Sequence, residues 1–261
     1  MTNIFGTIGK KTLSFLSLFE RFGAFIFFQL SLIPLIFKKP YRLREVVVQI
    51  DSIGAGTFGV ILLTAFFTGM VVTIQLYDSF HKFGTEAFIG FTVFISIAKE
   101  LGPVFGGLML ISRSISSMAA ELGTMRVTEQ IDALDCLSVN SKKYLLIPRI
   151  LATMISLPIL IIIFDFFGNL SAYLVSIYAL GISENSYLSN IKQMVEFEDV
   201  AQGIIKGVIF GYLIGSIGSY MGYFAKGGAK GVGIATIKAV IYSAITIFAA
   251  NYFISAVFIL I

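Results

Sequence analysis

The chain has very little of what metal-binding and thiol-dependent proteins rely on. Its 261 residues include one cysteine, one histidine and no tryptophan. Cys136 has no second cysteine with which to form an internal disulfide, and His81 has no companions for a zinc-ligand cluster. Charged residues make up 13% of the chain, about half the share of a typical soluble protein. The sequence therefore argues against zinc chemistry, Cys/His catalysis and a soluble domain.

Hydrophobic residues, in contrast, make up 57% of the chain, and no long polar stretch interrupts them. This composition is typical of a polytopic membrane protein. Because a spanning helix needs roughly 20 apolar residues, the chain has room for about five or six spans and short loops. We expect a single all-α membrane domain over residues 1–261, with no separate catalytic domain.

Five segments are apolar and long enough to form transmembrane helices. The predicted spans are 53–78, 87–118, 145–180, 203–224 and 234–261. Together they form a five-span core that covers residues 53–261.

The apolar segment 12–37 precedes this core and has basic residues on both sides. These residues are Lys10, Lys11, Lys38, Lys39, Arg42 and Arg44. Basic flanks mark the cytoplasmic side, and a single crossing cannot leave both flanks there. We therefore favour an interfacial helix within residues 1–45, with a transmembrane span as the alternative. No small-residue cleavage site follows the segment, so no removable signal peptide is expected.

Basic residues also alternate between the two sides of the predicted spans. Seven precede the first span, whereas only Lys82 separates the first span from the second. The connections 119–144 and 225–237 are basic again. The positive-inside rule places the N-terminus and these two connections in the cytoplasm and the C-terminus on the opposite side. We therefore attribute the net charge of +4 to topology and expect no nucleic-acid binding.

Residues 119–134 form a charged island with a helical pattern. An apolar stripe recurs at i, i+4, i+7 and i+10 in Val127, Ile131, Leu134 and Leu137. An acidic row lies beside it in Glu129, Asp132 and Asp135. The pattern predicts an amphipathic helix between the second and third spans that offers a surface to another protein.

The second predicted span carries two charges beside a helix-breaking residue. Lys99 and Glu100 lie at a depth where an ionisable residue costs on the order of 2.5 to 3.5 kcal/mol. Pro103 lacks an N–H and clashes with the carbonyl of Lys99, so the helix should kink or break and free that carbonyl. Two interpretations remain open: a buried pair that ties helices together, and a polar cavity that faces substrate.

Three other charged residues in the predicted spans have more than one possible role or partner. Arg113 lies near the predicted cytoplasmic end of its span, where a lipid-headgroup anchor is the default. Asp165 has Lys206 and Arg113 as candidate partners. Lys206 lies near the predicted outer face, where it either extends to water or attracts a phosphate.

The fourth predicted span contains a row of glycines at four-residue intervals: Gly203, Gly207, Gly211 and Gly215. Small residues at this spacing let two helices approach closely. Packing within the subunit is the simpler interpretation, and a subunit interface is the alternative. The glycine-rich segment 227–233 lacks the order of a nucleotide-binding loop, so any ATP would have to be hydrolysed by a partner.

These motifs together closely resemble the MlaE/YrbE permease family. The resemblance rests on Lys-Glu-Leu-Gly-Pro-Val at 99–104, Arg113, the 16 residues 119–134, Pro148-Arg149 and Leu157-Pro158. It covers the chain from about residue 40 to the end. Members are the membrane subunits of Mce-type ABC transporters, which move phospholipid between the two membranes of diderm bacteria. The family usually has Arg where this chain has Lys99, which keeps the charge and loses the bidentate geometry.

The resemblance implies a homodimer in the bacterial inner membrane, each copy with an interfacial helix, five spans and a cytoplasmic coupling helix at about 119–137. Two cytoplasmic ABC ATPase subunits would bind ATP and Mg²⁺, so this chain is expected to hold no cofactor or metal and to catalyse no reaction. The implied ATPase-coupling residues are Glu121, Arg126, Glu129 and Asp132. The N-terminus would be cytoplasmic and the C-terminus periplasmic.

The resemblance also implies that lipid binds between the two permeases. The expected lipid-binding residues are Lys99, Glu100, Leu101, Lys206, Phe80 and Phe83. A periplasmic ring of Mce-domain proteins and, in many systems, a small STAS-type protein would complete the assembly. Two other functions remain as alternatives: an ion-coupled secondary transporter with Lys99, Glu100 and Asp165 as relay, and a passive scaffold.

Overall fold

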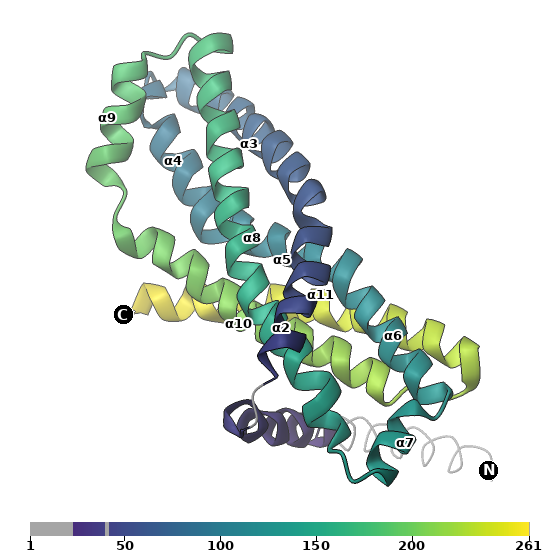
Figure 1. The fold of residues 1–261 in the computed structure, drawn as a ribbon. Coiled ribbons are helices and arrows are strands. Elements are labelled where there is room, and N and C mark those ends of the chain that lie inside the picture. The colour runs from purple at the N-terminus through teal and green to yellow at the C-terminus, as the bar shows by residue number, and fades with distance from the viewer. Residues whose placement is uncertain (1–22, 40–41, 261) are drawn as a thin grey trace, which may run out of the picture.

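The computed structural model describes residues 23–39 and 42–260 of the chain (Figure 1). The regular secondary structure of these residues is entirely helical, and no strand occurs among them. Five helical segments are long and apolar enough to cross a membrane: Leu43–Lys82, Glu86–Val127, Lys142–Ala179, Phe197–Tyr223 and Gly228–Leu260. The prediction of an all-α membrane protein with five spans is therefore confirmed. Every segment begins before its predicted start, because polar helical turns extend each hydrophobic core.

The first two spans are divided by π-helical turns. The first comprises α2 (Leu43–Ile50), the π turn η1 (Asp51–Ala55) and α3 (Gly56–Lys82). The second begins with the 3₁₀ turn η2 (Glu86–Phe88) and continues through α4 (Ile89–Ser96), η3 (Ile97–Leu101), α5 (Gly102–Leu110), η4 (Ile111–Ile115) and α6 (Ser116–Val127). A π turn is rare in proteins and often lies at a functional position.

The other three spans are more regular. The third comprises η5 (Lys142–Leu146), α8 (Ile147–Leu174) and η6 (Val175–Ala179), while α10 (Phe197–Tyr223) and α11 (Gly228–Leu260) are the fourth and fifth. Two short helices lie in the connections, α7 (Gln130–Cys136) and α9 (Glu184–Met194). In Figure 1, α9 lies at one end of the bundle beside α4, and α7 lies at the opposite end.

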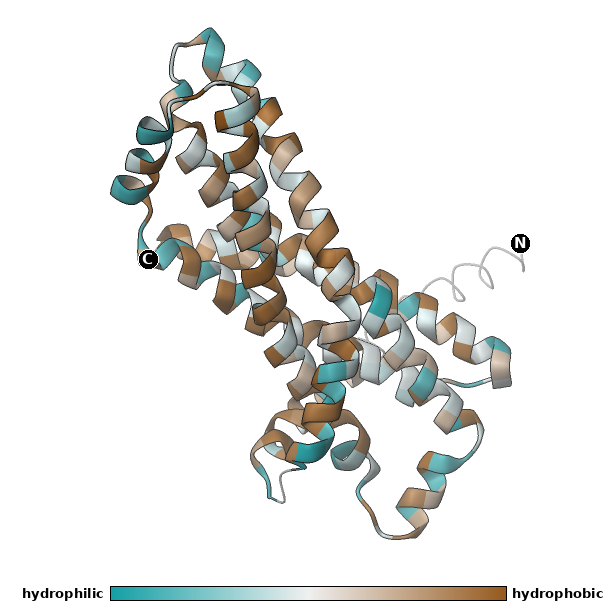
Figure 2. Ribbon diagram, turned by 45° about the horizontal axis from the view of Figure 1, so that its top comes forward, coloured by the Kyte–Doolittle hydropathy of each residue, from teal (hydrophilic) through white to brown (hydrophobic). Residues whose placement is uncertain are grey.

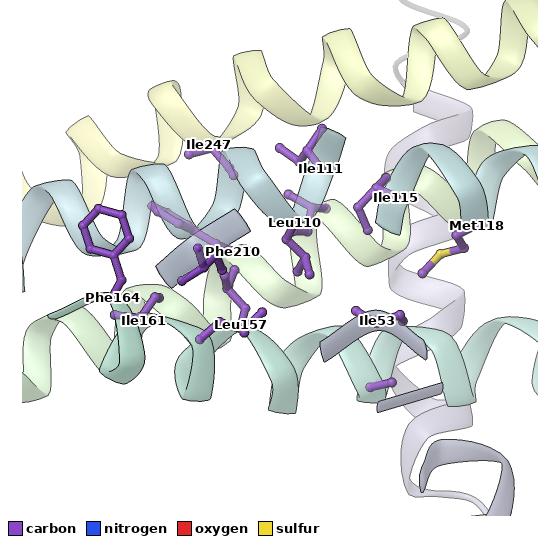
Figure 3. Close-up of a cluster of buried hydrophobic side chains, with 14 of the residues drawn as sticks. Ile53, Leu110, Ile111, Ile115, Met118, Leu157, Ile161, Phe164, Phe210 and Ile247 are labelled. Carbon is purple, nitrogen blue, oxygen red and sulfur yellow. The ribbon is translucent and has the colours of Figure 1, made fainter. Parts of the chain in front are cut away.

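The core forms where α8 packs against α3 on one side and α10 on the other. Figure 3 shows Leu157, Ile161 and Phe164 of α8 gathered with Phe210 of α10 and Ile247 of α11. The phenyl rings of Phe164 and Phe210 are fully buried. Since lipid tails are as apolar as these side chains, close packing and not water exclusion stabilises this contact.

The spans differ strongly in how much of their surface the chain itself covers. In the most apolar window of α10, 56% of the residues are buried, against 11% in α11. Figure 2 shows hydrophobic residues along the spans, with hydrophilic ones concentrated in α9 and the connections. Most of α11 therefore faces lipid or another protein chain.

The glycine row on α10 packs within the subunit, in agreement with the simpler interpretation. A Cβ at Gly211 would lie 2.6 Å from the carbonyl oxygen of Thr153 in α8. At Gly203 it would collide with the carbonyl oxygen of Ala98 in η3. These glycines let α10 approach the third span at one level and the second span at another.

The N-terminal helix is described from Gly23 to Phe37. This part would be about 22 Å long, which is short of the roughly 30 Å hydrocarbon core. It lies against the second half of α10, where the Phe28 ring packs edge-on against Tyr220 and Gln29 Nε2 donates to Ser216 Oγ at 2.7 Å. A short apolar helix before the five spans is therefore confirmed, while residues 12–22 of the predicted segment lie outside the described part of the chain.

Residues 119–137 do not form one continuous helix, and this part of the prediction is wrong. The second span continues as α6 to Val127, and Glu129 then adopts a left-handed backbone with φ of 60° before α7 begins. Because this turn changes the helical phase, the four residues of the predicted stripe do not share a face. Ile131 is fully buried, whereas Val127 and Leu137 are exposed.

Candidate functional site

A cluster of charged side chains lies where the second span widens into the π turn η3. Pro103 follows this turn in the first positions of α5. The helix does not break at Pro103. Pro103 has no N–H to donate to the carbonyl oxygen of Lys99 in the π turn before it. That oxygen instead accepts a hydrogen bond from Lys206 Nζ at 2.7 Å. The prediction that this carbonyl would be freed is confirmed.

Lys206 lies at the centre of the cluster. Its Nζ also lies 2.9 Å from Glu100 Oε1 and 2.7 Å from Ser255 Oγ, so each of its three protons has an acceptor. The Lys206 side chain is fully buried, whereas that of Glu100 is 42% exposed. The expectation that Lys206 extends to water is wrong. The fourth span begins at Phe197, six residues before the predicted start, which places Lys206 about 14 Å along the helix.

The fifth span completes the coordination of Glu100. Asn251 Nδ2 donates to Glu100 Oε2 at 2.7 Å, and Ser255 Oγ donates to Glu100 Oε1 at 2.8 Å. Sequence reasoning missed both residues. Their spacing of four was an available signal, since it puts two polar side chains on one face of an otherwise apolar helix.

Lys99 points to a different partner. Its Nζ lies 2.5 Å from Asp199 Oδ1 near the start of α10, and Asp199 Oδ2 accepts the backbone N–H of Glu196 at 2.9 Å. Glu196 and Asp199 form a capping box that fixes the first turn of α10. Asp199 was also missed, although an acidic residue three positions after a helix start is a recognisable capping signal. We call Lys99, Glu100, Asp199 and Lys206 the charged network.

Asp165 does not join the charged network. Its Oδ1 is buried without a hydrogen-bond partner among the described residues, and a Cβ at Gly102 would collide with it. Neither of its candidate partners, Lys206 and Arg113, pairs with it in the described part of the chain. The Asp165 carboxyl group instead faces the backbone where η3 meets α5.

The other predicted lipid-binding residues lie beside or away from this network. Leu101 is half-buried at the end of η3 and packs against the core. Phe80 is half-buried in the last turns of α3, and Phe83 is 82% exposed just beyond that helix. The structure therefore groups Lys99, Glu100, Leu101 and Lys206, whereas the two phenylalanines belong to the far end of the first span.

The four predicted coupling residues fall into two groups. Glu121 Oε1 lies 2.7 Å from Arg149 of α8, a guanidinium group that is almost fully buried. Arg126 lies 2.7 Å from Asp132, an exposed pair that joins the end of α6 to α7. Glu129 occupies the left-handed turn between these helices. Arg126, Glu129 and Asp132 thus form one exposed surface, from which Glu121 is separated by its contact with α8.

Comparison with known proteins agrees with this arrangement. The family model described as Permease MlaE matches residues 46–257. A "Probable ABC transporter permease protein" of Rickettsia bellii is 41% identical over 258 residues, which cover 99% of this chain and 98% of that protein. The "Intermembrane phospholipid transport system permease protein MlaE" of Haemophilus influenzae is 30% identical over 258 residues, with 98% of each chain covered.

A chloroplast protein of Arabidopsis thaliana, TRIGALACTOSYLDIACYLGLYCEROL 1, is 35% identical over 223 residues, which cover 85% of this chain and 64% of that protein. The region matched by the family model, residues 46–257, includes nearly all of the five spans and every residue of the charged network. The chain is an ABC transporter permease of the MlaE family.

Proposed function

We propose that this chain is the permease of an ABC transporter that moves phospholipid between the inner and outer membranes of a diderm bacterium. The charged network is the observation that carries this proposal. It places four ionisable groups inside the spans, where such residues usually mark a substrate pathway. The printed name of the Haemophilus influenzae relative supports phospholipid as the cargo.

The chemistry of the network suits a zwitterionic headgroup. Its two lysines and two carboxylates balance in charge, so neither sign dominates the site. Lys99 is the more accessible cation, with 30% of its side chain exposed, whereas Lys206 is fully enclosed. A lipid phosphate would compete with Asp199 for Lys99, and Glu100, which is 42% exposed, would accept a hydrogen bond from a headgroup amine or hydroxyl.

The acyl chains require an apolar surface beside the network, and α11 provides one. Ile241, Ile245 and Phe248 are exposed along the fifth span, which also contributes Asn251 and Ser255 to the network. In this proposal, a second copy of the chain completes a homodimer and encloses the lipid between the two permeases. Leu101 would contact the lipid beside Lys99 and Glu100.

Energy would enter at the opposite end of the molecule, through Arg126, Glu129 and Asp132. These residues form an exposed turn to which a cytoplasmic ABC ATPase subunit would bind on each permease. Closure of the two ATPases on ATP would push on α6 and α7 and narrow the lipid cavity towards a periplasmic Mce-domain ring. Such coupling requires that ATP and lipid each bind the two conformations with unequal affinity.

This proposal fixes the orientation in the inner membrane. The N-terminal helix and α7 would lie on the cytoplasmic side, as the basic connections predict, and α9 and the C-terminus would lie on the periplasmic side. A small STAS-type protein bound to the ATPase remains part of the proposed assembly.

An ion-coupled secondary transporter is the competing proposal, and Asp165 favours it. Its Oδ1 is buried and has no hydrogen-bond partner within residues 23–39 and 42–260, and a carboxyl oxygen of this kind at membrane depth is typical of proton relays. Transport by reconstituted complexes distinguishes the two. We expect transport to stop when the partner ATPase carries an inactivating substitution and to continue when ion gradients are collapsed. The reverse result would establish the secondary transporter.

The lipid site itself is tested by native mass spectrometry of the complex purified through a tag on this chain. We expect two permeases, two ATPases and bound phospholipid, with less lipid retained in the Lys99→Gln variant. Lys82→Gln is the matched control, because Lys82 pairs with Asp78 on the exposed end of α3. An intact complex without any lipid would instead identify a scaffold.

A further inference from the structure

A polar cavity lies between the first two spans, at the ends that the proposed topology places towards the cytoplasm. Its volume is about 350 Å³, at the lower end of the range for small-molecule sites. Its lining includes Gln49, Ser52, Arg113, Ser117 and Glu121. Arg113 follows Lys99 by 14 residues in the same span, about 20 Å along a helix. The cavity is therefore separate from the charged network.

Two π turns build the floor of this cavity, η1 from the first span and η4 from the second. The carbonyl oxygen of Ile53 in η1 accepts hydrogen bonds from Thr57 Oγ1 at 2.7 Å and Ser114 Oγ at 3.1 Å. The two hydroxyl groups lie 3.0 Å apart. These buried contacts join the spans, so the cavity is a formed feature of the fold.

Arg113 is the cation of the cavity, and its guanidinium group makes no hydrogen bond or ion pair with any group in the described ranges 23–39 and 42–260. Its Nε would lie 3.5 Å from a Cβ at Gly56, so the side chain extends along the first span. A guanidinium group within a span needs water or an anion beside it, because its charge is costly there.

Arg149 is a buried guanidinium group whose two terminal nitrogens have partners, while its Nε has none among the described residues. Its Nη2 lies 2.7 Å from Glu121 Oε1, and its Nη1 donates to the carbonyl oxygen of Leu145 at 2.9 Å. The charge of Glu121 is therefore balanced by Arg149, although Glu121 also lines the cavity. Arg113 is left as the unbalanced charge, and the cavity favours an anion.

We propose that this cavity binds the phosphodiester of a phospholipid headgroup from the adjacent leaflet, with Arg113 as the anion-binding residue. The guanidinium fork matches two phosphate oxygens, and Ser117 and Gln49 supply further donors. Glu121 uses Oε1 to accept a hydrogen bond from Arg149, and its Oε2 accepts a hydrogen bond from a headgroup amine or hydroxyl. The acyl chains would leave towards the lipid-facing surface of the first span, where Phe58 and Val60 are exposed.

Photolabelling tests this site in the full chain within its complex. The probe is a phosphatidylethanolamine with a diazirine in its headgroup, and labelled peptides are mapped by mass spectrometry. We expect label on peptides that contain Gln49 or Ser117. Arg113→Ala removes the guanidinium group and should reduce this label about tenfold or more. This is the loss of binding affinity expected when one charge-assisted hydrogen bond is removed. Arg113→Lys should retain part of it.

Arg42→Ala is the matched control, because Arg42 lies near the same end of the first span and stacks on Tyr144 outside the cavity. We expect unchanged cavity label in this variant, and unchanged label near Asn251 of α11, beside the charged network, in all variants. Unfolding temperatures must match the wild type, and Arg113→Lys keeps the test valid if Arg113→Ala does not fold.

The other possible occupants give different results. Inorganic phosphate that protects Arg113 from phenylglyoxal, in a cavity that lipid never labels, would identify a free-anion site and overturn the proposal. Cross-linking between two copies through these peptides would identify a subunit contact and also overturn it. Lipid label in the cavity of a complex that fails to transport would uphold this site and contradict only the proposed function.

Discussion

The charged network and the turn between α6 and α7 are both rich in charge, but they use it differently. In the network, Lys206 and Glu100 are 106 residues apart in sequence and pair across two spans. In the turn, Arg126 and Asp132 are six residues apart, and 30% and 54% of their side chains are exposed. The network therefore fixes the arrangement of the spans, whereas the turn leaves its charges available to another protein.

Removal of the central lysine should have the largest effect. Lys206→Met leaves Glu100 without its cation, and breaking a buried ion pair on one side typically costs about 3 to 5 kcal/mol. Thermal unfolding in detergent should show a large decrease in the unfolding temperature and a smaller yield of folded protein. Glu100 is partly exposed, so we expect the lower part of this range.

The double variant Lys206→Met with Glu100→Gln is the control for that experiment. It removes both charges, and most of the lost stability should return because no uncompensated carboxylate remains. If the double variant were as unstable as Lys206→Met alone, packing of the lysine chain and not its charge would hold the spans together.

Substitution of Gly203, where α10 closely approaches the π turn η3, should have the next largest effect on stability. Gly203→Ala brings a methyl group against the backbone carbonyl of Ala98, and overpacking of this kind typically costs about 1 to 3 kcal/mol. It should also lengthen the contact from Lys206 to the Lys99 carbonyl. Gly123→Ala in α6 should cost less. Its Cβ would lie 3.1 Å from a methyl group of Val232, which can shift, and 3.4 Å from the Cβ of Ala225, which is an ordinary van der Waals contact.

Gly233→Ala provides the reference for these two substitutions in the same unfolding experiment. No atom lies within 4 Å of a Cβ at this position in α11, so the higher helix propensity of alanine should stabilise the protein by up to about 1 kcal/mol. A similar gain in stability in all three variants would show that helix propensity, and not the distance between backbones, decides the outcome.

The difference between the two regions also explains what the sequence could predict. The five spans, the freed carbonyl of Lys99 and the glycine packing all follow from local composition and helix geometry. The partners of Glu100 do not, because Asn251 is 151 residues away and its choice depends on how the spans pack. Lys206 was placed too near the surface because a capping box extends α10 through acidic residues that resemble a loop.

The turn escaped prediction for a different reason. A helical pattern over 119–137 assumes one continuous helix, and a left-handed glutamate is uncommon enough that the pattern gives no warning of it. Arg113 and its cavity depend on two π turns in different spans, and no periodicity in the sequence marks where a helix gains an extra residue.

Charge reversal in the turn should change stability much less than changes in the network. The pair of Arg126 and Asp132 is exposed, so Arg126→Asp should cost about 1 kcal/mol or less. If an ATPase docks here, Arg126→Asp together with Glu129→Lys should nevertheless uncouple ATP hydrolysis from lipid transport. Full transport by this double variant in reconstituted vesicles would exclude the proposed coupling role.

Substitution of Glu129 by glycine should change stability least. It also distinguishes the effect of the backbone conformation from the effect of the carboxylate charge. Glu129 and Ser138 both have φ of 60°, on either side of α7, and glycine adopts this backbone without strain. Each substitution to glycine should therefore stabilise the protein by up to about 1 kcal/mol. Only Glu129→Gly removes a carboxylate from the proposed docking surface, so ATPase coupling should fall in that variant and remain normal in Ser138→Gly. Equal coupling in the two variants would mean that the ATPase recognises the shape of this turn and not its charge.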